Sequence, residues 1–336
     1  MLRNALILYW VIFTALFAEP YVLDFGPMFP KPDLPEDNPL TVEGVELGRR
    51  LFYDQLLSRR NNLSCNNCHE QHSGFSDNRR FSIGFDGETT RRNSMALFNL
   101  AYSDGFFWDG RASTLRAQAL KPIEDQKEMG ARLPNVIRKL QQRGYPALFA
   151  KAFGDTEINS KRISLAIEQF MLSLTSIDSK YDHVQSGHAT FTPAEQRGHD
   201  LFMSDRVRCA ACHAPPFFTN NTFSNNGTGP TANDRGLAET SKDDKDLGKF
   251  KTPSLRNVEV THRYMHDTRF KTLKDVLEYY NTQVKDSPYL DPAMKPFVGG
   301  LGLTEAECTD IIAFLRTLTD HTFLTNPNYA DPRKSR

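Results

Sequence analysis

The chain has 336 residues, of which 39% are hydrophobic, and its 41 Lys and Arg residues equal its 41 Asp and Glu residues in number. This length fits two globular domains better than one. A formal net charge of zero gives no reason to expect nucleic acid or an anionic membrane as a partner. We therefore expect neither among the partners of this chain.

The N-terminus has the features of a secretory signal peptide. A short basic start, Met1-Leu2-Arg3, precedes a run from Ala5 to Ala18 that carries no charge. A membrane-spanning helix needs about 20 apolar residues, and this run is shorter. We predict a signal peptide over residues 1–18, export to the periplasm, and no stable membrane insertion after cleavage. An uncleaved N-terminal anchor is the alternative.

Helical patterns dominate the rest of the chain. Apolar residues at helical spacing predict helices over 133–142, 163–173 and 273–280. Thr192 and Thr304 each stand three residues before a glutamate, which predicts a capping box at the start of two further helices. Alternating strand patterns are scarce, so the fold is predicted to be mainly α.

The chain also carries signs of an internal duplication. Residues 48–52 and 198–202 both fit the pattern G-x-x-L-F, and each precedes a pair of cysteines. We predict two domains, 19–187 and 188–336, with the boundary in the Ser-Gly-His-Ala-Thr stretch where they meet. The stretch 220–249 is rich in Asn, Gly, Thr and Asp, and it is predicted to be a long surface loop.

Four of the five cysteines form two Cys-x-x-Cys-His motifs, at residues 65–69 and 209–213. In this motif two thiols add to the vinyl groups of haem, and the histidine binds the iron. A zinc site does not need a histidine directly after each second cysteine, and a redox dithiol would need a βαβ setting, which the sequence lacks. We therefore predict two covalently bound haem c groups. The attaching thiols are Cys65, Cys68, Cys209 and Cys212, and the proximal ligands are His69 and His213.

Five further motifs keep the order and approximate spacing of a known family. They are Ser-Ile-Gly at 82–84, Phe-Phe-Trp-Asp-Gly-Arg at 106–111, Lys-Glu-Met-Gly at 127–130, Thr-Pro-Ser-Leu-Arg-Asn at 252–257 and Tyr-Met-His-Asp at 264–267. With the two Cys-x-x-Cys-His motifs, they make residues 40–318 resemble the bacterial di-haem cytochrome c peroxidase and MauG family, and its MauG-like branch in particular. The resemblance implies two cytochrome c-like domains, each carrying one covalently bound haem c.

The resemblance implies that the N-terminal haem meets hydrogen peroxide. Many members place a histidine ligand in a Ser-Ile-Gly-His stretch, but Phe85 stands at that position here. Phenylalanine cannot bind iron, so we expect an open, five-coordinate haem; His72 is too close in sequence to His69 to reach the opposite face easily. Glu128 matches the family's distal glutamate, which can move a proton during peroxide cleavage, and Gln118 matches a second polar residue near this pocket. Without the resemblance, Glu128 would be read as an exposed loop residue.

Trp108 matches the tryptophan between the two haems of the family, where an oxidisable ring can relay an electron or a hole. A buried core anchor is the alternative role, and the two are compatible. A calcium site between the haems is also implied. Its matching positions are the Asn93 side chain and the main-chain carbonyls of Thr261 and Arg263, and oxygen ligands suit Ca²⁺.

The sixth ligand of the C-terminal haem separates two branches of the family. Tyr280 occupies the matching position, with Tyr279 as its neighbour and Met265 and Met294 as the methionine candidates. Methionine raises the potential of a haem and suits it to receive electrons from a donor protein. Tyrosinate is an anionic oxygen donor that stabilises higher oxidation states, and it is typical of MauG-like members.

We therefore predict a MauG-like enzyme that reacts with H₂O₂ and oxidises an aromatic residue, such as tryptophan, on a partner protein. One alternative is a cytochrome c peroxidase that reduces H₂O₂ to water with electrons from a small cytochrome or cupredoxin. Another is a non-enzymatic di-haem electron carrier, which would need both irons closed by protein ligands. Cys308 is predicted to be a small buried apolar residue rather than a redox thiol.

Overall fold

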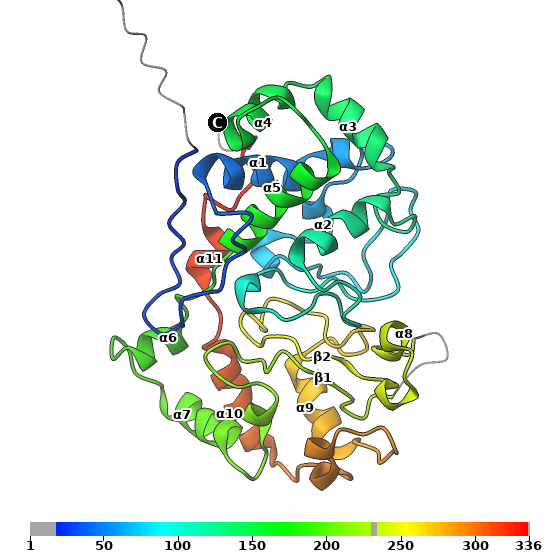
Figure 1. Ribbon diagram of the computed structural model, residues 1–336. Helices are drawn as coiled ribbons and strands as arrows, with labels where there is room; N and C mark the ends of the chain where they lie inside the picture. Colours follow the sequence, from blue (N-terminus) through cyan, green and yellow to red (C-terminus); the bar gives the residue numbers. More distant parts are fainter. Residues whose placement is uncertain (1–17, 230–233, 335–336) are drawn as a thin grey trace, which may run out of the picture.

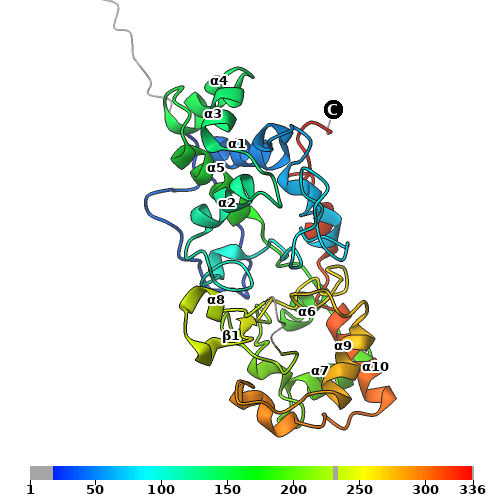
Figure 2. The same cartoon turned by 90° about the vertical axis from the view of Figure 1, so that its right-hand side faces the viewer.

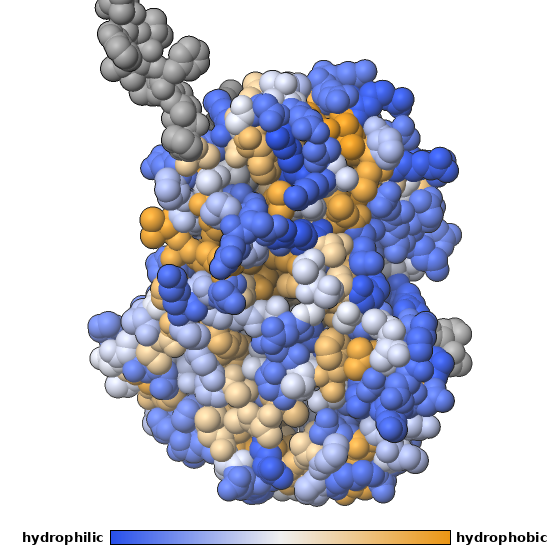
Figure 3. Space-filling view, viewed as in Figure 1, coloured by the Kyte–Doolittle hydropathy of each residue, from blue (hydrophilic) through white to orange (hydrophobic). Residues whose placement is uncertain are grey.

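The computed structural model describes residues 18–229 and 234–334, so the predicted signal peptide lies outside the described residues except for Ala18. Two helical lobes lie one above the other, and each has its own hydrophobic core (Figures 1 and 2). Hydrophilic residues cover most of the face seen in Figure 3, with hydrophobic residues interspersed mainly over the upper lobe. No helix in the described part of the chain is long and apolar enough to cross a membrane.

The elements divide between the lobes as follows. The first lobe holds α1 (Val42–Tyr53), α2 (Leu115–Glu124), α3 (Leu133–Gln141), α4 (Tyr145–Phe153) and α5 (Ser160–Ser173). The second lobe holds α6 (Lys180–Gln185), α7 (Pro193–Met203), α9 (Leu273–Thr282) and α10 (Glu305–Arg316). Shorter elements are α8 (Ala238–Ser241), α11 (His321–Thr325) and the antiparallel strands β1 (Phe223–Ser224) and β2 (Phe250–Lys251). The predicted mainly α fold is confirmed, and α3, α5 and α9 are the three helices predicted from apolar spacing.

Both lobes are built on one close helix crossing. In the first lobe α1 packs on α5, and a Cβ atom on Gly48 would lie 1.9 Å from the carbonyl oxygen of Ala166. In the second lobe α7 packs on α10, and a Cβ atom on Gly198 would lie 1.9 Å from the carbonyl oxygen of Asp310. Only glycine permits so close an approach of two backbones. The G-x-x-L-F pattern therefore marks the same structural unit in each lobe.

Both predicted capping boxes are present at the starts of α7 and α10. The Thr192 hydroxyl accepts from the backbone N–H of Glu195, and the Glu195 carboxylate accepts from the backbone N–H of Thr192 at 2.7 Å. Thr304 and Glu307 exchange the same two hydrogen bonds at 3.2 and 2.8 Å. Each exchange satisfies two backbone donors that a helix start would leave free. The caps thus fix where the two crossing helices of the second lobe begin.

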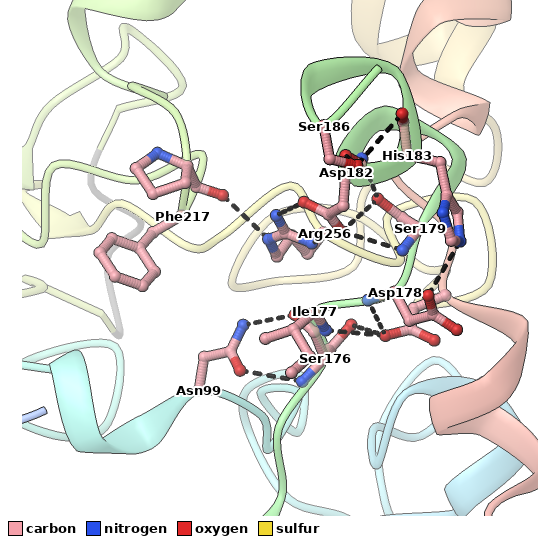
Figure 4. A network of polar contacts seen from close by, with 12 residues as sticks. Asn99, Ser176, Ile177, Asp178, Ser179, Asp182, His183, Ser186, Phe217 and Arg256 are labelled. Carbon is pink, nitrogen blue, oxygen red and sulfur yellow. Dashed lines mark hydrogen bonds and ion pairs between the residues drawn. The ribbon is translucent and has the colours of Figure 1, made fainter. Parts of the chain in front are cut away.

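The connection between the lobes is held by buried polar contacts (Figure 4). The Asn99 side chain donates to the carbonyl of Ser176 and accepts from its backbone N–H, both at 2.9 Å. A few residues later, the Asp182 carboxylate accepts from the Arg256 guanidinium at 2.6 and 2.9 Å. Asn99 belongs to the first lobe and Arg256 to the second, so hydrogen bonds attach the connecting segment to both lobes.

The C-terminal segment returns to the first lobe. Phe323 and Tyr329 pack in the first hydrophobic core, and Figure 1 shows α11 beside the helices of that lobe. Tyr181, which precedes the predicted boundary, packs in the second core. The packing thus differs from the predicted split into 19–187 and 188–336, because the chain crosses between the lobes once before α6 and again after α10.

The stretch 220–249 is more than a surface loop, and this part of the sequence prediction is wrong. It contains β1 and α8, and the side chains of Asn225 and Asp234 are buried. Asp234 accepts two hydrogen bonds of 2.7 Å from Arg92, a residue of the first lobe. Burial here depends on a distant ion pair rather than on apolar spacing, so the sequence pattern could not show it. Residues 230–233 of this stretch lie outside the described residues.

Candidate haem site

A cavity of about 810 Å³ reaches from the first lobe into the second. Side chains of both cores line it, among them Phe52 and Leu115 of the first and Phe202 and Leu315 of the second. The residues singled out in the sequence for haem attachment, catalysis or calcium also line it. They are Cys65, Cys68, His69, Asn93, Trp108, Gln118, Glu128, Cys209, Cys212, His213, Thr261, Arg263 and Tyr280. Segments far apart in the sequence therefore meet around one largely apolar space.

The first Cys-x-x-Cys-His motif forms a short 3-10 turn that presents both thiols and the imidazole to this cavity. Burial raises the pKa of Cys65 to about 12 and that of Cys68 to about 11, which favours the neutral form of each thiol before haem is attached. The His69 Nδ1 lies 2.8 Å from the carbonyl oxygen of Phe75, and burial lowers the pKa of its ring. A neutral imidazole that donates from Nδ1 has its Nε2 lone pair free for a metal.

The second motif repeats this arrangement. It forms the 3-10 turn Cys209–Ala211, and His213 Nδ1 lies 3.1 Å from the carbonyl oxygen of Phe218. Burial lowers the pKa of His213 to about 4, so this ring is also neutral. Phe75 and Phe218 share a positive φ, 56° and 52°, which turns each carbonyl towards its histidine. Two thiols and an oriented imidazole at each end of an apolar cavity fit covalently bound haem c.

Gln118 and Glu128 are among the polar side chains that line the cavity in the first lobe. Gln118 lies on α2, and its Oε1 is buried without a hydrogen-bond partner among the described residues. Glu128 lies in the loop after α2, and burial raises the pKa of its carboxyl to about 7, with a smaller contribution from Asp125 and an opposing one from Arg111. A carboxyl with a pKa near neutral can both accept and donate a proton at physiological pH.

The Ser-Ile-Gly stretch packs closely on the Glu128 loop. A Cβ atom on Gly84 would lie 2.2 Å from the carbonyl oxygen of Lys127, and the backbone N–H of Phe85 donates to the carbonyl of Glu128 at 2.8 Å. The Phe85 ring does not line the cavity; it packs on Gly130, where a Cβ atom would lie 2.2 Å from the ring. Position 85 is therefore turned away from the cavity as well as unable to bind iron.

Histidines other than the two of the motifs are scarce in the cavity wall. His72 is exposed, and its ring contacts the Glu70 carboxylate at 3.3 Å. Within the described ranges, the histidines that line the cavity are His69, His213 and His266. His266 belongs to the second lobe, where its ring stacks on Phe250 with centroids 3.5 Å apart. Its Nε2 is buried and has no hydrogen-bond partner among the described residues.

The second lobe presents a different set of side chains. Tyr280 lines the cavity, and its hydroxyl accepts a hydrogen bond of 3.0 Å from the Asn226 amide. Burial raises the pKa of this hydroxyl, and the Asn226 bond opposes that rise. Tyr279 is buried outside the cavity wall, and its hydroxyl donates to the Asn226 carbonyl at 3.2 Å. Met265 and Met294 line the cavity as well, so the second lobe presents both tyrosine and methionine side chains to it.

Trp108 lies where the two lobes meet. Its indole N–H donates to the carbonyl of Asn93 at 2.9 Å, and its ring contacts the His266 ring edge-on, with centroids 6.4 Å apart. The Asn93 amide nitrogen donates to the Arg263 carbonyl at 3.2 Å, so two of the three predicted calcium ligands are adjacent. No group of three or more His, Cys, Asp or Glu side chains suited to a metal occurs in the part that the structure covers. A cation here would therefore depend on amide and carbonyl oxygens.

The sequence reasoning missed that the duplication extends to the loops around Trp108. Residues 93–111 and 251–269 correspond at a constant offset of 158 positions, which aligns Trp108 with His266 and Asn93 with Lys251. Across the contact, Asn93 N–H donates to the carbonyl of His266 at 2.8 Å, and Lys251 N–H donates to the carbonyl of Trp108 at 2.9 Å. One sequence signal could have revealed this correspondence. Both loops contain an aspartate followed two residues later by an arginine, in Phe-Trp-Asp-Gly-Arg and in Met-His-Asp-Thr-Arg.

The backbone confirms the correspondence of the two loops. Phe107 and Met265 occupy matching positions and have φ of 67° and 68°, and Asn99 and Asn257 have φ of 54° and 57°. Isolated bridges close the same turn in each loop, from Phe106 to Ala112 and from Tyr264 to Phe270. Two related loops therefore face each other across the contact between the lobes.

Comparisons with known proteins agree with this architecture. The di-haem cytochrome c peroxidase family matches residues 42–190. The methylamine utilization protein MauG of Methylophilus methylotrophus is 33% identical over 296 residues, covering 86% of this chain and 87% of that protein. The MauG of Methylorubrum extorquens is 36% identical over 84% of this chain and 80% of its own length. The cytochrome c551 peroxidase of Nitrosomonas europaea is 31% identical over 84% of this chain and 81% of that protein.

Among solved structures, a MauG-like protein associated with microbial copper homeostasis superimposes with a TM-score of 0.86. It is 34% identical, and the match covers 94% of this chain and 100% of that one. Identity above 30% over most of both chains, together with a common fold, leaves one conclusion. The chain belongs to the di-haem cytochrome c peroxidase and MauG family, and it is an oxidoreductase of the di-haem peroxidase type.

Proposed function

We propose that this protein is an exported, periplasmic di-haem c enzyme that reacts with hydrogen peroxide and oxidises a residue, such as tryptophan, on a partner protein. Each lobe would be a cytochrome c-like domain with one haem, attached at Cys65 and Cys68 in the first lobe and at Cys209 and Cys212 in the second. The relatives named MauG and those named peroxidases support peroxide as the oxidant and a protein as the second reactant.

The first lobe would be the peroxide site. His69 would hold the iron from one side, and no other described histidine of this lobe lines the cavity. Glu128, with a pKa near 7, can take a proton from peroxide and return it to the departing oxygen. The unpartnered Gln118 oxygen can accept a hydrogen bond from a peroxide O–H and so orient it. When bound, the haem iron supplies the redox chemistry that these side chains lack.

The observation that carries the MauG-like assignment is the Tyr280 hydroxyl in the cavity wall. Tyrosine oxygen is an established class of axial haem ligand. The Asn226 amide donates to this oxygen at 3.0 Å, and a donor at that position favours the oxygen in its anionic form. His213 and Tyr280 would both hold the second haem, which would leave no position for peroxide there and reserve this lobe for electron transfer.

Trp108 would connect the two haems. Its indole is fixed by the hydrogen bond to Asn93 and by the contact with His266, so the ring has a single placement between the lobes. An oxidisable ring in that position suits the relay of an electron or a hole. A Ca²⁺ ion held by the Asn93 side chain and the Thr261 and Arg263 carbonyls would stabilise the same contact; its oxygen donors suit that ion.

A second candidate function is a cytochrome c peroxidase that takes electrons from a small donor protein. Met265 and Met294 line the cavity, and the Met265 sulfur lies 3.6 Å from the Asn226 amide that also contacts Tyr280. Methionine at the second iron would raise its potential and favour electron acceptance. The MauG-like enzyme and the cytochrome c peroxidase would therefore differ in whether Tyr280 or Met265, both beside Asn226, binds the second iron.

The experiment adds H₂O₂ to the holoprotein mixed with the periplasmic protein fraction and searches that fraction by mass spectrometry for oxidised tryptophan. A parallel sample contains reduced small cytochrome c, followed by its loss of absorbance. The proposal predicts tryptophan oxidation that disappears in Glu128→Gln. Rapid oxidation of the cytochrome with no modified protein would favour the second candidate, and no reaction with peroxide in either sample would contradict both.

A further inference from the structure

Buried Lys and Arg side chains in the described part of the chain are matched by buried carboxylates, with one exception. Three of these side chains are buried: Arg92, Arg256 and Lys251. Arg92 contacts the Asp109 carboxylate at 2.6 Å, and Arg256 contacts the Asp182 carboxylate at 2.6 Å, as Figure 4 shows for Arg256. Buried charges in proteins are normally paired in this way. Lys251 is the exception.

The Lys251 ammonium meets only neutral acceptors. It donates to the Asp104 carbonyl at 3.3 Å and to the Asn221 amide oxygen at 3.2 Å, and no described carboxylate lies within ion-pair distance. Burial lowers the pKa of Lys251 to about 8, and the charge of the Asp104 carboxylate opposes that shift. An uncompensated buried charge is strongly destabilising, and Lys251 lines the cavity. The Lys251 ammonium therefore lacks an anionic partner, and it lines a cavity that could hold an anionic group beside it.

The backbone at Lys251 fixes where its side chain points. Lys251 lies in β2, its N–H donates to the carbonyl of Trp108, and its ammonium lies 6.0 Å from the centre of the Phe223 ring. Neighbouring side chains of a strand point to opposite sides. Phe250 stacks on His266, so Lys251 points away from that stack.

The correspondence between the two loops gives Lys251 a counterpart. Asn93 occupies the matching position in the first lobe, and its side chain reaches across to the Arg263 carbonyl of the second. Lys251 reaches across in the opposite sense, to the Asp104 carbonyl of the first lobe. One position is predicted to bind a cation and the other carries a cation of its own. The two matching side chains thus reach across the contact between the lobes in opposite directions.

Two observations relate Lys251 to the second Cys-x-x-Cys-His motif. Its ammonium donates to Asn221, which follows that motif closely in the chain. The carbonyl of Pro253, two residues after Lys251, faces the His213 ring. Haem carries two propionate carboxylates, the anions that a c-type cavity receives with its cofactor. We propose that the Lys251 ammonium is the counter-ion of a propionate carboxylate of the haem held by His213. This inference rests on the proposed function, since it requires haem at that motif.

The test measures the midpoint potentials of both haems by spectroelectrochemistry. A cation beside a haem stabilises the reduced form, which has one positive charge fewer. Lys251→Gln is expected to raise the ratio of oxidised to reduced second haem about tenfold at a fixed potential, a fall of about 59 mV for one electron. Lys251→Arg keeps the charge and should keep the potential. The half-buried ion pair of Lys249 with Asp246 provides the matched control, Lys249→Gln, which should change neither haem.

A second readout keeps the inference testable if Lys251→Gln folds poorly. The resonance Raman bending bands of the propionates report their hydrogen bonding directly, and they should shift at the second haem in Lys251→Arg and Lys251→Met. Unchanged bands and an unchanged second potential in a protein with both haems attached would overturn the inference, as would a shift confined to the first haem. A purified protein without haem, shown by its intact mass, would instead contradict the proposed function.

Discussion

The two ends of the cavity share a Cys-x-x-Cys-His motif and differ in the other side chains that line the cavity. His69 and His213 each lie near a backbone carbonyl, at 2.8 and 3.1 Å, and each motif belongs to a lobe with a glycine at its central helix crossing. The first end presents Glu128 and an unpartnered Gln118 oxygen. The second end presents Tyr280, fixed by Asn226.

This difference shows which parts of a duplicated unit are constrained. The helix crossing and the oriented histidine are needed wherever haem is held, so both copies keep them. The side chains opposite each histidine would set the reactivity of a bound haem, and it is these side chains that differ between the copies. The same holds at the contact between the lobes, where Trp108 and His266 occupy matching positions but only an indole is readily oxidised.

The largest expected effect concerns the difference between the ends. Glu128→Gln removes the group proposed to move protons at the first end, so the reaction with H₂O₂ should slow by about 10²–10⁴-fold with haem content unchanged. Stopped-flow mixing with H₂O₂ measures it, and the exposed Glu124→Gln is the matched control. A normal rate in Glu128→Gln would remove the proposed distinction between the two ends.

The pH dependence of the same reaction sharpens this test. Burial raises the pKa of Glu128 to about 7, and only the ionised carboxylate can take a proton from peroxide. The rate should therefore rise with pH through about 7 and then level off, and Glu128→Gln should lack this rise. A rate independent of pH between about 5 and 9 in the unchanged protein would argue against Glu128 as the base.

The next effect tests an ion pair that only one loop possesses. Arg256 pairs with Asp182, whereas the matching residue of the first loop is Phe98. Asp182→Asn leaves the guanidinium uncompensated and should lower the free energy of unfolding by about 3–5 kcal/mol. Arg256 holds the pKa of Asp182 below its ordinary value, so the stabilisation is present above about pH 4 and is lost as pH falls further. Urea unfolding of Asp182→Asn and the unchanged protein at pH 7 and pH 3 measures the loss of unfolding free energy. Equal losses at the two pH values would contradict a stabilising ion pair.

A smaller effect tests the similarity of the lobes. Gly48→Ala and Gly198→Ala each place a Cβ atom 1.9 Å from a backbone carbonyl unless the helices separate. Each should destabilise its lobe by about 1–3 kcal/mol, although alanine is the better helix former by about 1 kcal/mol. Thermal unfolding of the holoprotein measures both variants. A stabilised variant would mean that the crossing of that lobe is looser than described.

The smallest structural change tests the connection between the ends. Trp108→Phe keeps a buried aromatic ring and should preserve folding and both haems, but it removes the indole and its bond to Asn93. Electron transfer between the haems should slow, as measured by flash reduction followed at the two haem spectra. Unchanged transfer would leave Trp108 with a packing role only.

Much of this architecture follows from local sequence. Apolar spacing located α3, α5 and α9, and Thr192 and Thr304 located the starts of α7 and α10, because caps and periodicity are local properties. The return of α11 to the first core and the burial of Asp234 depend on partners distant in the chain, which no local pattern reports.

The candidate site divides in the same way. The attachment residues follow from the Cys-x-x-Cys-His motifs alone, and the family resemblance adds Glu128, Gln118, Trp108 and Tyr280, all of which line the cavity. The outward turn of the Phe85 ring and the unpaired charge of Lys251 are consequences of packing. They became visible only with the side chains in place.

The proposed open first haem and the proposed closure of the second by Tyr280 can be distinguished by electron paramagnetic resonance. The spectrum of the resting ferric holoprotein is recorded for the unchanged protein, Tyr280→Phe and Met265→Leu. We expect one high-spin and one low-spin haem, with the low-spin signal altered by Tyr280→Phe and unaffected by Met265→Leu. Two low-spin haems in the unchanged protein, or a low-spin signal that responds to Met265→Leu alone, would contradict the account.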